Sequence, residues 1–200
     1  MIYNLVRKRT DINIFKKEKS MGKKVIIISS TMRKNGNSEI LCREFAAGAE
    51  SAGNEVETIY LREHEINFCK GCWACRKLNK CIINDGINPL LEKIKNADVL
   101  VFGTPIYYYS MTGQLKTFLD RMSPIYDTEH RFRDVYLLAT AADMEIEAVD
   151  GAIKEIKGWV ECFEEVKLVG VVCGTGASEI GDIEKRPEKL KEVYNLGKNV

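Results

Sequence analysis

The chain has 200 residues, of which 45% are hydrophobic and 30% are charged, and its formal net charge is +1. These proportions are typical of one globular domain and exclude a disordered or fibrous chain. The near-zero net charge argues against a dedicated nucleic-acid binder. No apolar run approaches the ~18 residues that a membrane span needs, so we expect no membrane segment.

The cysteine content indicates a metal or redox site. Seven cysteines are present, and four of them lie between residues 69 and 81. Such a cluster favours a reducing compartment over a secreted disulfide scaffold, and we therefore expect a cytoplasmic protein.

Residues 1–20 differ from the rest of the chain. They carry six lysines and arginines against two acidic residues, a local charge of +4. They lack the apolar stretch and cleavage site of a signal peptide. A basic arm for an anionic partner is one interpretation. We favour a poorly ordered extension before a domain that spans 21–200, with Met21 as an alternative start.

From Lys23 onward, apolar runs alternate with segments of helical periodicity. The predicted strands are 25–28, 54–61, 98–103, 135–140 and 166–173. The predicted helices are 38–52, 87–96, 112–122, 148–163 and 187–195.

This alternation predicts an α/β fold of three layers, a five-stranded parallel sheet with helices on both faces. The flavodoxin-like strand order 2-1-3-4-5 is the commonest five-strand solution, and its switch point lies between strands one and three. Ligands in such folds bind beyond the carboxyl ends of the strands at that point. The segments after Ser29 and Gly103 are therefore the first candidates for a site.

The segment 31–38, which joins the first strand to a helix, suits a phosphate. It offers hydroxyl groups, an arginine and flexible Asn-Gly backbone, and the helix start adds free amides and the positive end of a dipole. It matches neither a Walker loop nor the G-x-G-x-x-G fingerprint. An ordinary polar turn with Asn37 as the helix cap stays open.

Three consecutive tyrosines, 107–109, follow the third strand. Aromatic rings at the rim of a cleft can flank a flat ligand ring. Alternatively, tyrosines there fill the core or a subunit contact, and we expect this of at least one of them.

The segment 31–38 resembles the phosphate loop of the NAD(P)H-dependent FMN reductase family, and 105–108 with 112–121 resembles its flavin-ring loop and the helix after it. The likeness continues through 181–183 and 196–198, and so covers essentially 21–200. It implies a flavodoxin-like fold with non-covalent FMN and a flavin-dependent oxidoreductase. The implied FMN-binding residues are Thr31, Arg33, Asn35, Gly36, Asn37, Ser38, Thr104, Pro105, Ile106, Tyr107, Tyr108 and Thr140.

Two positions depart from the pattern of that family. Met32 replaces the usual proline, and the segment 140–143 lacks the glycines often found in the third flavin loop.

The clustered cysteines lie in a long connection at about 62–86, and a loop of that length usually serves a function. Three thiolates at two-residue intervals can wrap three corners of a cubane, and a fourth completes the cage. Gly71 permits the tight turn of the first interval. The predicted ligands of a [4Fe–4S] cluster are Cys69, Cys72, Cys75 and Cys81. Zinc, disulfides and incidental thiols stay open.

The remaining cysteines, Cys42, Cys162 and Cys173, fall in predicted helices or a buried strand. We expect them to be small apolar fillers.

The cysteine spacing within this fold resembles the iron–sulfur flavoproteins of anaerobic archaea and bacteria. That likeness implies electron relay between the cluster, FMN and a partner such as ferredoxin. Strand order places the cysteine connection nearer the phosphate than the flavin ring. The likeness therefore implies a homodimer or homotetramer in which a neighbouring subunit brings cluster and flavin together.

Two other functions stay open. One is a cluster-less NAD(P)H-dependent reductase of FMN or quinones, and the other is a flavodoxin-like carrier without turnover of its own. We expect no catalytic side chain, because a flavin carries its own chemistry.

Overall fold

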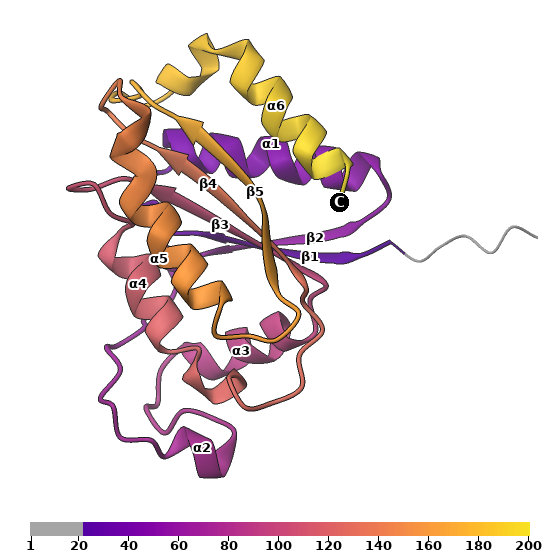
Figure 1. Ribbon diagram of the computed structural model, residues 1–200, viewed down its shortest axis with the longest axis vertical. Coiled ribbons are helices and arrows are strands. Elements are labelled where there is room, and N and C mark those ends of the chain that lie inside the picture. Colours follow the sequence, from indigo (N-terminus) through magenta and orange to yellow (C-terminus); the bar gives the residue numbers. More distant parts are fainter. Residues whose placement is uncertain (1–21) are drawn as a thin grey trace, which may run out of the picture.

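A parallel five-stranded sheet forms the centre of the computed structural model, which describes residues 22–200 (Figure 1). The predicted extension 1–20 lies outside the described residues. The strands pair in the order β2-β1-β3-β4-β5, which confirms the predicted order. Their bounds are β1 (Lys24–Ser29), β2 (Glu55–Tyr60), β3 (Val99–Pro105), β4 (Asp134–Thr140) and β5 (Lys167–Gly174).

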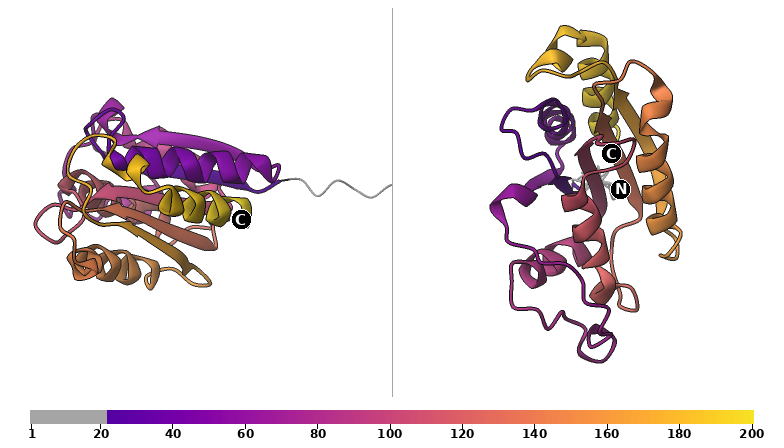
Figure 2. Two further views of the ribbon diagram at one scale, coloured as in Figure 1. Left: turned by 90° about the horizontal axis from the view of Figure 1, so that it is seen from above. Right: turned by 90° about the vertical axis from the view of Figure 1, so that its left-hand side faces the viewer.

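Helices cover both faces of the sheet, as expected. The helices are α1 (Asn37–Ser51), α2 (Cys75–Leu78), α3 (Ile87–Lys95), α4 (Gly113–Asp120), α5 (Asp150–Val160) and α6 (Pro187–Lys198). Two of them, α1 and α6, lie on one face, whereas α3, α4 and α5 lie on the other (Figures 1 and 2).

Two of the departures from the predicted elements concern α5 and α2. A 3-10 turn (Ile146–Val149) replaces the start of the predicted helix 148–163, and α5 ends at Val160. The four-residue α2 was not predicted, because one turn is too short to show helical periodicity. Over residues 22–200, no helix is long and apolar enough to cross a membrane.

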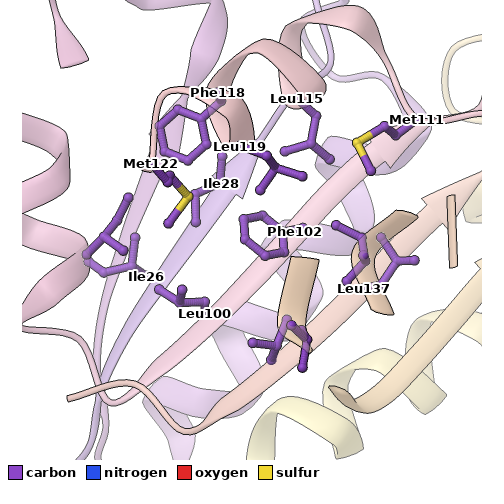
Figure 3. Close-up of a cluster of buried hydrophobic side chains, with 14 of the residues drawn as sticks. Ile26, Ile28, Leu100, Phe102, Met111, Leu115, Phe118, Leu119, Met122 and Leu137 are labelled. Carbon is purple, nitrogen blue, oxygen red and sulfur yellow. The ribbon is translucent and has the colours of Figure 1, made fainter. Parts of the chain in front are cut away.

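Strand β1 supplies both hydrophobic cores. Ile26 and Ile28 pack toward α3, α4 and α5, whereas Val25 and Ile27 pack toward α1 and α6. Figure 3 shows the first of these cores, where the α4 side chains lie beside Ile28 and Phe102. All four β1 side chains are fully buried, which explains why a strand of a parallel sheet reads as one continuous apolar run.

Strand β3 and helix α1 approach so closely that only glycine fits between them. A Cβ at Gly103 would overlap the Sγ atom of Cys42. Gly103→Ala should therefore lower the free energy of unfolding by about 1–3 kcal/mol. Adding Cys42→Ala should return part of that loss, because the clash disappears. Urea unfolding of the two single variants and the double variant measures this coupling.

Gly158→Ala is the matched control, since no described atom lies within 4 Å of the added Cβ inside α5. It should raise the free energy of unfolding by about 0.5–1 kcal/mol. A Gly103→Ala protein as stable as the wild type would show that the two elements can separate freely.

Candidate functional site

Four segments that follow strands enclose one cavity at the carboxyl edge of the sheet. They come after β1, β3, β4 and β5, and the right-hand view of Figure 2 faces this edge. The cavity measures about 170 Å³ and is lined by Thr31, Arg33, Gly36, Asn37, Ser38, Pro105, Ile106, Tyr107, Thr140, Ala142, Ala177, Ser178 and Ile180. Most of the predicted FMN-binding residues are thus brought together here.

The first wall of the cavity is the start of α1. The helix begins at Asn37 after Gly36, and over the described residues no side chain caps it. Its first amide N–H groups therefore have no acceptor within the helix and carry the positive end of the dipole. A Cβ at Gly36 would lie only 3.0 Å from the carbonyl oxygen of Arg33 and 3.1 Å from Oγ1 of Thr31. A side chain at position 36 would therefore crowd these two oxygen atoms.

Asn37 ties this wall to the loop after β5. Its Nδ2 donates to the carbonyl oxygens of Ala177 (3.1 Å) and Glu179 (2.8 Å), and its Oδ1 accepts from the backbone N–H of Ile183 at 3.2 Å. The interpretation of Asn37 as a helix cap is therefore wrong. The side chain of Asn37 holds the start of α1 against the loop after β5. Only the backbone N–H of Asn37 is therefore left to donate to an anion.

Two further contacts close the cavity. Nη1 of Arg33 donates to the carbonyl oxygen of Ser178 at 3.2 Å, which places the guanidinium across the loop after β5. The hydroxyls of Ser38 and Thr140 lie 2.7 Å apart and are both buried. The loops after β1, β4 and β5 are thus hydrogen-bonded to one another.

Three predicted site residues do not line the cavity. The Asn35 side chain accepts from Nη1 of Arg43 at 2.7 Å. Thr104 is buried, and its Oγ1 accepts from the backbone N–H of Thr112 at 3.2 Å. Tyr108 is fully exposed. The side chains of Asn35 and Thr104 thus support the loops, and an FMN contact of all three residues stays a prediction.

The tyrosine segment forms a tight hairpin turn. Tyr107 and Ser110 exchange backbone hydrogen bonds of 3.0 and 3.2 Å. Between them, Tyr108 and Tyr109 have φ angles of 50° and 62°, the positive values that a type I′ turn requires. None of the three tyrosines fills the core: all are exposed, Tyr107 lines the cavity, and the Tyr109 hydroxyl donates to Oδ2 of Asp143 at 3.1 Å. Of the expectation that at least one fills the core or a subunit contact, only the contact is left. A subunit contact stays a prediction.

The loop after β5 is the part of the site that the sequence analysis missed. Ala177, Ser178 and Ile180 line the cavity. In a parallel sheet, the loops after all strands lie at the same edge, so the segment after the fifth predicted strand could have been included in the candidate site.

The cysteine connection forms a second, separate cavity. It begins beside the first loop, where Nη1 of Arg62 donates to the carbonyl oxygen of Thr31 at 3.5 Å. It then runs to α2, away from the sheet (Figure 1). The cavity there measures about 130 Å³, and its lining includes Cys69, Cys72, Cys75 and Cys81 together with Arg121 at the end of α4. Among described residues, none lines both cavities.

The four thiols share a cavity without forming a finished metal site. Cys69 and Cys72 are exposed, whereas Cys75 and Cys81 are half-buried. Within residues 22–200, no three cysteine, histidine or acidic side chains are grouped closely enough to hold a metal ion. Gly71 has a φ of 62°, which confirms the tight turn predicted at this position.

A buried ion pair between Asp85 and Arg121 holds the base of the cysteine connection, where Asn67 and Asp85 lie side by side. We call this base the neck of the connection. Asp85 accepts from the backbone N–H groups of Asn67 (2.9 Å) and Ile87 (3.2 Å), and Nη1 of Arg121 donates to it at 2.7 Å. Both charged side chains are almost completely buried. Burial alone would raise the pKa of Asp85, but these hydrogen bonds and the charge of Arg121 lower it to about 2.

The remaining cysteines behave differently from one another. Cys42 and Cys173 are buried, as predicted, and burial raises the pKa of the Cys42 thiol to about 12. Cys162 is exposed, so its prediction as an apolar filler is wrong. The reason is that α5 ends at Val160 and leaves Cys162 in the turn that follows.

A doubly wound parallel sheet with an open helix start at its switch point defines a flavodoxin-like protein. Sequence comparison identifies the family. A model of the NADPH-dependent FMN reductase family matches residues 23–160. The chain belongs to that family and is therefore a flavin-dependent oxidoreductase.

Individual relatives agree with this family. An iron-sulfur flavoprotein of Archaeoglobus fulgidus is 29% identical over 182 residues, covering 88% of this chain and 78% of that one. An iron-sulfur flavoprotein of Methanocaldococcus jannaschii is 39% identical over 102 residues, about half of each chain (51% and 53%). An FMN-dependent NADH-azoreductase of Bacillus anthracis, solved in complex with FMN, has the same fold with a TM-score of 0.67 at 14% identity. That match covers 88% of this chain and 98% of the other.

The low pKa of Asp85 predicts acid sensitivity. Because folding lowers this pKa from 3.8 to about 2, the native state is stabilised above pH ~4, and roughly 2 kcal/mol is lost as the pH falls from ~4 to ~2. Asp85→Asn should lose this part of the acid slope. It should also be less stable at pH 7 by about 3–5 kcal/mol, because Arg121 stays buried without a counter-charge.

Urea unfolding at neutral and acid pH measures both effects. Asp120→Asn, at the exposed carboxylate one residue before Arg121, is the control and should keep the wild-type slope. An Asp85→Asn protein with an unchanged slope would contradict the assignment.

Proposed function

We propose that the chain binds FMN in the first cavity and a [4Fe–4S] cluster at Cys69, Cys72, Cys75 and Cys81. In this proposal it passes electrons between the cluster, FMN and a ferredoxin-like partner in the cytoplasm. One observation carries the proposal: a single chain builds a cavity at the start of α1 and, apart from it, a cavity bordered by four cysteines. The iron-sulfur flavoproteins among its relatives support it.

The phosphate of FMN fits the first wall of the cavity. The free amides at the start of α1 and the hydroxyl of Thr31 would donate to it, and Arg33 would supply positive charge. Gly36 supports this assignment, because a Cβ there would crowd the Thr31 hydroxyl that is proposed to donate to the phosphate. Asn37 acts through its side chain as a brace between loops.

The flavin ring fits the opposite wall. Pro105, Ile106 and Tyr107 line that side of the cavity, and Thr140 lies between the two walls. When bound, FMN supplies hydride and single-electron chemistry. Of the described residues that line the cavity, none is a carboxylate, a histidine or a cysteine. In this proposal the lining residues bind and orient the cofactor, and the flavin carries the redox chemistry.

The separation of the two cavities supports an oligomer. Since no described residue lines both, we infer that a second copy of the chain brings a cluster to each flavin in a homodimer or homotetramer. The exposed tyrosine turn is the surface that we assign to this contact. A monomer with full electron transfer between its own two groups would contradict this arrangement.

A cluster-less NAD(P)H-dependent reductase of FMN or quinones is the second candidate. One observation favours it: the flavin cavity is complete without the cysteine connection, since no described cysteine lines it. Steady-state oxidation of NADH or NADPH with a quinone acceptor would separate either enzyme from an electron carrier without turnover.

An anaerobic absorption spectrum with iron and acid-labile sulfide counts tests the cluster. We expect flavin bands, a broad shoulder at about 400 nm and about four irons per chain. Flavin bands without iron would favour the cluster-less reductase. A colourless protein that takes up no FMN would contradict both functions.

Flavin titration tests the phosphate site. Arg33→Ala should weaken FMN binding by about 10- to 100-fold, because a charge-assisted hydrogen bond contributes about 1.5–3 kcal/mol. The affinity for riboflavin, which lacks the phosphate, should stay the same. Quenching of flavin fluorescence gives both dissociation constants.

Lys34→Ala is the control, since Lys34 is the neighbouring cation and does not line the cavity. Equal losses for FMN and riboflavin in Arg33→Ala would show that Arg33 does not contact the phosphate.

A further inference from the structure

Arg121 reaches into the wall of the cysteine cavity. It follows the last residue of α4, and its side chain is fully buried. Nη1 donates to the carbonyl oxygen of Asn67 at 2.5 Å and to Oδ2 of Asp85 at 2.7 Å. Nη2 donates to Oδ1 of Asp85 at 3.0 Å and lies 3.3 Å from Sγ of Cys81. The guanidinium thus joins the neck of the connection to a cysteine sulfur.

The Nε–H donor of Arg121 makes no hydrogen bond to the described residues. Within the described part of the chain, Nε of Arg121 is buried and has no hydrogen-bond partner. A buried donor without a partner costs about 1–3 kcal/mol, more when the group is charged. The same side chain lines the cysteine cavity and contacts Cys81, so the guanidinium there has one donor that its protein partners leave unused.

The position of Cys81 is fixed independently of Arg121. Its backbone N–H donates to Oδ1 of Asn88 at 2.8 Å, and its carbonyl oxygen accepts from Nδ2 of Asn88 at 2.9 Å. Asn88 belongs to α3, so this helix holds the backbone of the cysteine. By contrast, Cys69 and Cys72 lie in the exposed part of the connection. The contact between Arg121 and Cys81 is therefore part of the fixed wall of the cavity.

We propose that Arg121 is the positioning residue that hydrogen-bonds the Cys81 ligand and raises the reduction potential of the cluster. This inference rests on the proposed function. N–H donors beside a cluster sulfur stabilise the more negative, reduced state, and such bonds set cluster potentials. Asp85 shares the guanidinium, so the pair is neutral as a whole, and the N–H groups nearest the sulfur carry the effect.

Two variants separate this role from a purely structural one. Arg121→Lys keeps the charge and loses the fork of donors. Arg121→Met with Asp85→Asn removes both charges, so that neither partner stays buried and unpaired. Both proteins should have a lower cluster midpoint potential than the wild type in a redox titration followed by electron paramagnetic resonance. Both should also lose iron to a chelator about 10-fold faster, as is typical when a partner of a metal ligand is removed.

Arg131→Lys is the matched control, because Arg131 forms a more exposed ion pair with Asp98 outside the cysteine cavity. Its potential and its rate of iron loss should equal those of the wild type. FMN content should be unchanged in all variants. Wild-type potentials and rates of iron loss in both Arg121 variants would overturn the proposal while leaving the cluster itself in place.

A measurement on the wild-type protein covers the case in which the variants do not fold. In a protein labelled with ¹⁵N-arginine, pulsed electron paramagnetic resonance of the reduced cluster should show coupling to a ¹⁵N nucleus. Absence of this coupling would overturn the role of Arg121. A wild-type protein without iron and sulfide after anaerobic reconstitution would instead overturn the cluster and this inference together.

Discussion

Parallel strands all end at the same edge of a sheet, and the candidate flavin site depends on this constraint. Segments that are far apart in sequence, at 31–38, 105–107 and 177–180, meet there because β1, β3 and β5 point the same way. Geometry alone leaves such loops free to move apart. Asn37 prevents this, because its side chain bonds carbonyl oxygens and an amide in the loop after β5. The start of α1 and the loop after β5 are therefore held together on that side of the cavity.

The sequence predicted those features that depend on neighbouring residues. The buried run at 25–28, the helical spacing after residue 38 and the positive φ of Gly71 all follow from local chemistry. The side-chain role of Asn37 could not be predicted, since its partners lie about 140 residues away. The same holds for Arg121, whose carboxylate partner is 36 positions distant. Local patterns identify the residues of a loop, but tertiary contacts decide which atoms stay free for a ligand.

The cysteine connection combines a rigid neck with an exposed tip. Asp85, Asn88 and Arg121 hold its base through buried or half-buried hydrogen bonds. Cys69 and Cys72, at the tip, are exposed. Local stability follows burial and hydrogen bonding, so the tip is the part that a metal centre would order on binding.

Helix α4 links the two cavities mechanically. At its start, Thr112 caps the helix and its backbone N–H donates to Thr104, directly behind Pro105 in the flavin cavity. At its end, Arg121 holds the neck of the cysteine connection. Eight residues of helix span about 12 Å, and the buried face of α4 packs on the sheet core. The separation of the two cavities within one chain is therefore set by a packed helix.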